Sequence, residues 1–280
     1  MPLIGSHLSV AGGLHKAFER GDFLGCESMQ IFTRNQRQWQ SKPLSFQEID
    51  NFYIASKSSS VKTVVSHASY LINLAGSSDT RMRSEKALIE EIERCAQLNI
   101  SDTVLHPGFA GDESKEEAIR KLSDSLIRVI NATSAYKVRV LLETMAGQGS
   151  VLGADFSDFS SLLDAVDDNP RIGFCADMCH IFAAGYEIRS AEGYERTVSL
   201  MSKHMGLYNI HCWHLSDSKT EKGSNKDRHE HLGCGEIGLT PFSMLMGDER
   251  FSNIPAILET PKDGGGDEEN LSILRKLRGV

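Results

Sequence analysis

The 280-residue sequence lacks the features that mark exported and membrane-bound proteins. Its N-terminus, MPLIGSHLSV, has no basic stretch followed by a long apolar one, and the chain carries no obvious lipidation signal. No window reaches the roughly 18 apolar residues that a membrane-spanning helix needs. We therefore expect a soluble, cytoplasmic protein. With 40% hydrophobic residues the chain is long enough for one sizeable core, so we expect a single domain over residues 1–280.

Paired cysteines are also lacking. The six cysteines are scattered, and none forms the C-x2-C spacing of a zinc ribbon: Cys26, Cys95, Cys175, Cys179, Cys212 and Cys234. A chain of this size has no need of disulfide staples, so we interpret them as reduced thiols that mostly pack in the core. Cys175 and Cys179 lie close enough in sequence to hold a metal, but the three-residue gap between them and the lack of a second pair favour packing.

Positive charge is scarce as well. The formal net charge is −8, whereas proteins that bind nucleic acids contact the phosphates with Lys and Arg. Bound divalent cations would weaken this objection, because three of them would bring −8 to −2 and would place positive charge where a phosphate binds. The charge balance alone therefore excludes neither a nucleic acid nor a small-molecule substrate.

What the sequence does have is a regular alternation of two patterns. Short β-branched or apolar runs lie at 3–6, 28–32, 61–66, 103–105, 138–142, 171–176, 209–215 and 256–258. Apolar residues at helical spacing lie between them, at 45–58, 81–98, 115–135, 156–166, 191–203 and 268–278. Eight strands alternating with helices predict a (β/α)8 TIM barrel, an α/β fold for which 280 residues is a typical size. A doubly wound open sheet is the alternative.

Six of the eight runs end in, or are followed at once by, a residue type that commonly binds metal ions. These residues are His67, His106, Glu143, Asp177, His214 and Glu259. In a barrel the carboxyl ends of all strands meet on one face, which is where active sites are built. Taken singly, such a His usually lies in a loop and such an Asp usually caps a helix. Together they favour metal binding, because clustered carboxylates repel one another and lose hydration unless cations lie among them.

Three further candidates lie near this set: His180 in DMCH, and Asp227 and His229 in DRHEH. The nine candidates comprise five imidazoles and four carboxylates, a mixture that suits zinc better than magnesium, which prefers oxygen ligands. Nine ligands are too many for one tetrahedral ion. Two or three closely spaced ions that share a bridging carboxylate would accommodate them, and that arrangement serves in-line displacement at phosphorus.

Longer stretches of the chain form a specific pattern. They are GSHLSVAGGL from Gly5, FTRNQRQW at 32–39, HASYLINLA at 67–75, LHPG at 105–108, LETMAGQGS at 142–150, DMCHIFAAGY at 177–186, HLSDS at 214–218, DRHEHLGCGEIG at 227–238 and ILETP at 257–261. In order and spacing they resemble the endonuclease IV family of apurinic/apyrimidinic endonucleases, over nearly the full chain.

The resemblance implies three zinc ions per chain. His67, His106 and Glu143 would hold the first; Glu143 would bridge to a second, held also by Asp177, His214 and Glu259; His180, Asp227 and His229 would hold the third. All nine positions carry the expected residue. The family pattern reads ENTAGQG, whereas Thr144 and Met145 follow Glu143 here, which puts the surroundings of the bridging ligand in doubt.

The resemblance also implies a reaction in base excision repair. The phosphodiester 5′ to an abasic site in double-stranded DNA would be hydrolysed to a 3′-hydroxyl and a 5′-deoxyribose phosphate, and 3′-phosphodiesterase activity on blocked ends is expected besides. We expect a metal-activated water to attack the phosphorus, with Glu143 and Glu259 as the catalytic carboxylates that help to orient it.

Three residues are predicted to contact the DNA. Arg37, in a loop rich in long polar side chains, is the candidate that enters the minor groove and fills the gap left by a flipped nucleotide. The alternative for this loop is a solvated segment anchored by Trp39. The resemblance places Tyr70 and Leu71 against the base stack, although alone they are typical core residues.

Three histidines outside the ligand set receive other roles. We expect His7 to donate a hydrogen bond to the site, and we interpret His204 and His211 as structural.

Two other functions remain as alternatives. Metal-dependent sugar isomerases and epimerases share the barrel and its strand-end ligands, but they have no use for the third ligand set or the Arg37 loop. A non-catalytic module that recognises damaged DNA or stores zinc would bind without cleaving. We favour the endonuclease, and we expect a monomer because one face must wrap DNA.

Overall fold

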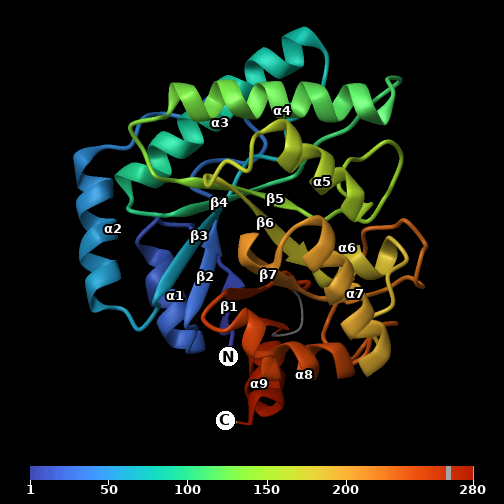
Figure 1. The fold of residues 1–280 in the computed structure, drawn as a ribbon. Coiled ribbons are helices and arrows are strands. Elements are labelled where there is room, and N and C mark those ends of the chain that lie inside the picture. The colour runs from blue at the N-terminus through green and yellow to red at the C-terminus, as the bar shows by residue number, and fades with distance from the viewer. Residues whose placement is uncertain (263–265, 280) are drawn as a thin grey trace.

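Eight parallel strands close into a barrel in the computed structural model, which describes residues 1–262 and 266–279 (Figure 1). Around the barrel the order is β1-β10-β7-β6-β5-β4-β3-β2. The strands are β1 (Leu3–His7), β2 (Ser28–Ile31), β3 (Thr63–His67), β4 (Asp102–Leu105), β5 (Arg139–Glu143), β6 (Ile172–Asp177), β7 (Ile210–Leu215) and β10 (Pro255–Leu258). The predicted barrel and all eight predicted strands are confirmed, and the open-sheet alternative is wrong.

Helices surround the barrel (Figure 1). They are α1 (Lys16–Leu24), α2 (Phe46–Ser58), α3 (Ser78–Gln97), α4 (Lys115–Ala132), α5 (Phe156–Ala165), α7 (Ala191–His204), α8 (Thr240–Gly247) and α9 (Gly266–Arg278). The six predicted helices are confirmed, while α1 and α8 escaped prediction because they have few turns. None of the described helices combines the length and the apolar composition that a bilayer-spanning segment needs.

Shorter elements decorate the barrel. The helix α6 (Met178–Ala183) follows β6, and 3-10 turns lie at η1 (Leu207–Asn209) and η2 (Glu249–Phe251). A small antiparallel hairpin, β8 (Asp217–Ser218) with β9 (His229–Glu230), follows β7. Both α6 and this hairpin lie on the carboxyl side of the barrel, so they add to the face on which the sequence places its candidate ligands.

The helices α2 and α4 begin where side chains satisfy their free N–H groups. Ser45 accepts a hydrogen bond from the backbone N–H of Glu48, whose carboxylate accepts one from the Ser45 N–H in return. Ser114 caps α4 in the same way by accepting from the Glu117 N–H. These caps fix where each helix leaves its loop, and hence where the helix packs against the strands.

Six apolar side chains fill the inside of the barrel, one from each of six strands. They are Val65, Val104, Leu141, Cys175, Cys212 and Ile257, and each is completely buried. A second, larger apolar cluster fills the space between strands and helices. Because side chains alternate along a strand, residues two positions further on point the same way. Those residues are the six strand-end candidates, so the inner layer forms the floor beneath them.

Glu91 of α3 is a buried carboxyl between this helix and the strands of the barrel. The hydroxyls of Thr33 and Ser66 donate hydrogen bonds to it. Burial raises the pKa of Glu91 above its ordinary value. The hydrogen bonds from the two hydroxyl groups offset part of the cost of burying the carboxyl, but the low-dielectric surroundings disfavour its charged form.

We predict that Glu91→Gln changes how stability depends on pH. A carboxyl whose pKa is raised by folding stabilises the fold below its ordinary pKa of about 4.3, and that contribution is lost as the pH rises through the raised value. In urea unfolding between pH ~4 and ~8, the variant should therefore gain stability relative to the parent as the pH rises. Glu93→Gln, at an exposed position of the same helix, is the control. A similar trend in both variants would contradict the assignment.

Candidate metal centre

A cavity of about 500 Å³ opens where the strands end. Six of the nine predicted ligands line it, and they come from distant parts of the sequence, as the barrel topology requires. The other three, His67, Asp177 and His214, are buried, and each lies within 4 Å of a lining residue, either Glu143 or His180. The full lining comprises His7, Phe32, Tyr70, His106, Glu143, His180, Asp227, His229, Glu259, Thr260 and Lys262.

The first donor group consists of His67, His106 and Glu143, whose ligand atoms lie within 4.8 Å of one another. The Nε2 atoms of His67 and His106 lie 3.3 Å and 3.1 Å from the same carboxylate oxygen, Oε2 of Glu143. His67 and Glu143 are buried, whereas His106 reaches the cavity. The structure therefore brings together the three residues that the sequence assigned to the first ion.

The second donor group combines Glu143, Asp177, His214 and Glu259, again within 4.8 Å. His214 Nδ1 lies 3.0 Å from Oε1 of Glu143 and 3.5 Å from Oε2 of Glu259. Glu143 thus presents one oxygen to the first group and the other oxygen to the second. This is the position that a bridging carboxylate occupies between two ions.

The third donor group lies on loops rather than on barrel strands. His180 of α6 and His229 of β9 place their Nε2 atoms 3.3 Å and 3.2 Å from Oδ1 of Asp227. The two Nε2 atoms are 3.5 Å apart. Asp177 lies between this group and the second, since its Oδ2 is 3.9 Å from both His214 Nδ1 and His229 Nε2.

Hydrogen bonds on the far side of four rings fix which nitrogen faces the groups. The Nδ1 atoms of His67, His180 and His229 lie 2.6 to 2.8 Å from the backbone carbonyls of Ala68, Thr144 and Glu259, and His214 Nε2 lies 2.8 Å from Gln30 Oε1. A carbonyl oxygen only accepts, so each of these nitrogens carries the proton. The opposite nitrogen, with its lone pair, then faces the carboxylates, as in metal-binding histidines.

This arrangement places hydrogen-bond acceptors of the histidines opposite acceptors of the carboxylates. When both imidazoles are neutral, as metal binding requires, the lone pairs of His180 and His229 point at each other and at Asp227. Asp177 uses Oδ1 to cap α6 by accepting from the His180 N–H, while its buried Oδ2 has no hydrogen-bond partner among the described residues. Cations would satisfy all of these atoms, so the residues present fit a polynuclear metal centre.

The close packing of carboxylates and imidazoles also shifts the pKa values of the site. Burial alone would lower the pKa of His229, but Asp227 and Asp177 raise it to about 9. Burial opposes ionisation of Glu143, yet His214 and His106 hold the pKa of that carboxyl well below its usual range. Burial raises the pKa of Asp177. Each group therefore depends on compensating charge from its neighbours or from bound cations.

Three supporting residues were missed in the sequence. Gln30, fully buried in β2, accepts from His214 and donates to Oε1 of Glu259 at 2.6 Å. Thr144 orients two candidates, because its carbonyl accepts from His180 Nδ1 and its hydroxyl accepts from the Asp177 N–H at 2.9 Å. The departure from the family pattern at this position therefore still supplies hydrogen bonds to the site. The only sequence signal for Gln30 was a polar residue inside an apolar run.

Asp217 is the third supporting residue, and it organises the loop of the third group. Its carboxylate accepts backbone N–H bonds from Ser218, Gly233, Ile237 and Gly238 at 2.7 to 3.2 Å. These bonds tie the segment after His229 to the end of β7. Asp217 stood within a matching stretch, HLSDS, but nothing in its sequence context revealed this role.

One of the three predicted DNA-contact residues, Tyr70, lines the cavity, and the other two lie in its own segment and in the neighbouring loop. Tyr70 lines the cavity, is 51% exposed and packs its ring against those of Phe32, His67 and His106. This exposure argues against the alternative that Tyr70 is an ordinary core residue. Leu71 beside it is half-buried. Arg37 is exposed, and its loop is joined to the Tyr70 segment by a hydrogen bond from Ser69 Oγ to the Gln36 carbonyl.

The Arg37 loop is anchored from within, and Trp39 is one of its anchors, as the alternative for this loop also predicted. The buried guanidinium of Arg34 donates to the carbonyls of Gln38 and Trp39 and pairs with Glu90 at 2.9 Å. Trp39 is partly buried and packs against the main core cluster. A fixed base with one exposed arginine at its tip is suited to inserting that side chain into a neighbouring molecule.

The remaining histidines and cysteines have distinct surroundings. His7 Nδ1 lies 3.2 Å from Glu259 Oε1 and 3.0 Å from Gln30 Nε2 at the edge of the cavity, so its tautomer sets whether it donates to the carboxylate or accepts from the amide. His204 bonds Ser160 outside the cavity, and half-buried His211 does not line it. All six cysteines are free thiols. Cys175 and Cys179 do not share one candidate donor group; Cys175 instead lies beside Cys212.

Comparison with known proteins places this barrel in a class and then in a family. The model of the family described as xylose isomerase-like TIM barrel matches residues 22–277. A D-tagatose 3-epimerase-like protein of known structure, 20% identical, superposes with a TM-score of 0.76 over 98% of this chain and 96% of its own, which shows a shared fold.

Two further relatives specify the family. "Probable endonuclease 4" of Chloroflexus aurantiacus is 43% identical over 99% of this chain and 98% of that protein. The crystal structure of endonuclease IV from Thermus thermophilus is 30% identical and superposes with a TM-score of 0.88 over 99% of this chain and 98% of that one. The chain belongs to the endonuclease IV family, which confirms the resemblance found in its motifs.

We predict that Gln30→Leu weakens metal retention. The substitution removes the acceptor that fixes the His214 tautomer and the donor to Glu259, and loss of such a supporting contact typically lowers metal affinity about 10- to 100-fold. Competition with a zinc-chelating dye measures the change. Gln40→Leu, at an exposed loop position, is the matched control. Equal zinc retention by both variants would show that Gln30 has no such role.

Proposed function

We propose that this protein is a zinc-dependent endonuclease of DNA repair that hydrolyses the phosphodiester 5′ to an abasic site. The observation that carries the proposal is the sharing of Glu143 between two donor groups at the mouth of the barrel, with a third group alongside. Polynuclear centres of this kind serve displacement at phosphorus. Membership of a family of endonucleases supports DNA as the substrate.

The three donor groups would hold three zinc ions. Mixed imidazole and carboxylate ligands favour zinc over magnesium or calcium, which take oxygen ligands. Glu143 would belong to the first two ions, and His180, Asp227 and His229 would hold the third. When bound, zinc supplies Lewis acidity toward water and toward phosphate oxygens at neutral pH.

The protein's own side chains supply orientation. Glu143 and Glu259 both contact His214 and line the cavity, and they are the carboxylates that would position the attacking water and accept its proton. Backbone carbonyls and Gln30 hold the histidines in one tautomer, so the donor atoms are ordered before substrate arrives. The products would be a 3′-hydroxyl and a 5′-deoxyribose phosphate.

The rim would select the damaged strand. Exposed Arg37 would enter the minor groove on its anchored loop, while Tyr70 and Leu71 would cover the base next to the lesion. An abasic nucleotide costs less to flip out than an intact one, because it has no base to unstack. The same cavity would admit a blocked 3′ end and would thereby allow a second, 3′-phosphodiesterase activity. We propose that the chain acts as a monomer in the cytoplasm.

A sugar isomerase or epimerase is disfavoured by the third donor group. Proton movement on a small sugar needs neither His180, Asp227 and His229 nor an exposed arginine loop beside the cavity. The epimerase-like structure shares the fold at 20% identity, whereas the Chloroflexus relative named for endonuclease activity matches nearly the full length at 43%.

We predict that the protein cuts a duplex oligonucleotide 5′ to a single abasic-site analogue and leaves undamaged duplex intact. Cutting should vanish after treatment with a strong zinc chelator and return when zinc is restored. Glu143→Ala should reduce the rate by at least about 1000-fold, because it removes the residue shared by two donor groups. Gel analysis of end-labelled products measures both the rate and the position of the cut.

Two controls make this test decisive. Circular dichroism of Glu143→Ala separates loss of chemistry from loss of the fold. Glu113→Ala, a carboxylate outside the cavity, should cut at the parent rate. Intact abasic duplex after incubation with zinc-loaded parent would contradict the proposed function.

We predict that Arg37→Ala weakens binding to abasic duplex by about tenfold, equivalent to about 1.4 kcal/mol, and lowers the preference over undamaged duplex. Arg196→Ala removes an arginine of similar exposure from α7 and should change neither quantity. Fluorescence anisotropy on an abasic duplex with a non-hydrolysable linkage 5′ to the lesion measures the affinities without cutting. Equal losses in the two variants would indicate a general charge effect rather than a specific contact.

A further inference from the structure

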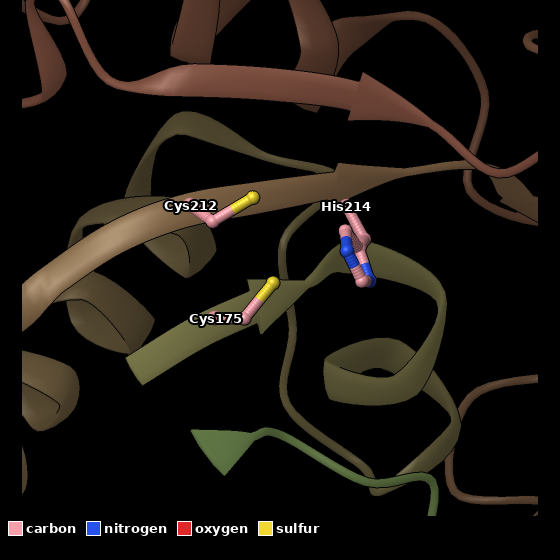
Figure 2. Close-up of side chains that lie close together, drawn as sticks. All are labelled: Cys175, Cys212 and His214. Atoms are coloured by element: carbon pink, nitrogen blue, oxygen red, sulfur yellow. The ribbon is translucent and has the colours of Figure 1, made fainter. Parts of the chain in front are cut away.

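Two thiols lie directly beneath the proposed metal centre. Cys175 of β6 and Cys212 of β7 are register partners on neighbouring parallel strands, and both are completely buried (Figure 2). Their Sγ atoms and a ring nitrogen of His214 all lie within 4.8 Å of one another. Figure 2 shows the imidazole beside the two thiols, so His214 belongs to a second potential donor group.

The two donor groups that meet at His214 differ in chemical character. Above it, Glu143, Asp177 and Glu259 offer oxygen atoms, whereas below it Cys175 and Cys212 offer sulfur. Carboxylates suit harder ions, and thiolates select soft, thiophilic ions. One imidazole cannot place the same lone pair on two ions, so occupation of the lower group would compete with the upper one for His214.

We infer that Cys175, Cys212 and His214 form a binding site for a soft divalent ion, and that an ion bound there withdraws His214 from the oxygen-rich group above. Binding brings in two positive charges with the divalent ion and releases two, because both thiol protons leave to solvent. The net charge of the site is therefore unchanged. This matters inside the barrel, where an uncompensated charge would be expensive to bury.

The surroundings favour a metal site over simple packing. The other four side chains of the inner layer are Val65, Val104, Leu141 and Ile257, which offer the thiols no polar partner. The thiol of Cys212 can donate to the Trp213 carbonyl, 3.7 Å away. Packing alone would be satisfied by aliphatic residues on these strands too, yet sulfur occurs at the two adjacent positions that face one imidazole.

Cadmium is the probe for this site. We expect Cd²⁺ added to the purified full-length protein to produce the ultraviolet sulfur-to-cadmium charge-transfer band, in a background where exposed Cys234 is replaced by Ser. The band should saturate at one ion per chain and should be lost in the double variant Cys175→Ala/Cys212→Ala. The matched control is Cys26→Ala/Cys95→Ala, which removes two buried thiols elsewhere and should keep the band.

The effect on cleavage rests on the proposed function and is measured separately. Cd²⁺ should inhibit incision of abasic duplex, and Cys175→Ala/Cys212→Ala should need about tenfold more Cd²⁺ for the same inhibition. A parent that fails to cut would overturn the proposed function and leave the optical test intact. A missing band in the parent, or a band that survives in the double variant, would overturn the thiol site. Equal inhibition of both proteins would overturn the competition for His214.

Discussion

The alternation of side chains along parallel strands is the constraint on which the site depends. Residues i and i+2 of a strand point to the same side, so a barrel filled by one side chain from each strand must direct the next one inward as well. Val65 is followed in this way by His67, and Leu141 by Glu143. The strand geometry that fills the barrel therefore also points the donor side chains toward one another, and no further structural feature is needed to bring them together.

The convergence of buried carboxylates and imidazoles creates an electrostatic cost, and the protein's own groups compensate only part of it. Imidazoles compensate Glu143 and Glu259, and hydrogen bonds to carbonyl oxygens fix four histidine rings. The compensation is incomplete, because Oδ2 of Asp177 is buried with no hydrogen-bond partner in the part of the chain that the structure describes. The fold itself holds these groups together, with an apolar floor below them and helices outside. Stability elsewhere thus supports a site whose own interactions are unfavourable without cations.

The sequence predicted the barrel and all eight strands because apolar runs and helical spacing report directly on burial. It also identified six of the nine donor candidates, since residues that end strands occupy one face whatever the loops do. The other three, His180, Asp227 and His229, were found from the motifs that contain them. It did not identify Gln30 or Asp217. Their importance lies in which atoms they meet, and those partners, His214 and the backbone after His229, come from distant segments. The same reason explains the cysteines: proximity in sequence suggested Cys179 as the neighbour of Cys175, whereas strand pairing supplied Cys212.

The three donor groups differ in what holds them, and this sets their relative rigidity. The first two are built on strand ends, where ladder hydrogen bonds and the inner layer fix the backbone on both sides. The third depends on α6, a two-residue strand and a loop organised by one carboxylate, Asp217. Elements with fewer backbone constraints open at lower free energy. The third group is therefore the part of the centre that can adjust its position, while the first and second groups, which share Glu143, stay fixed.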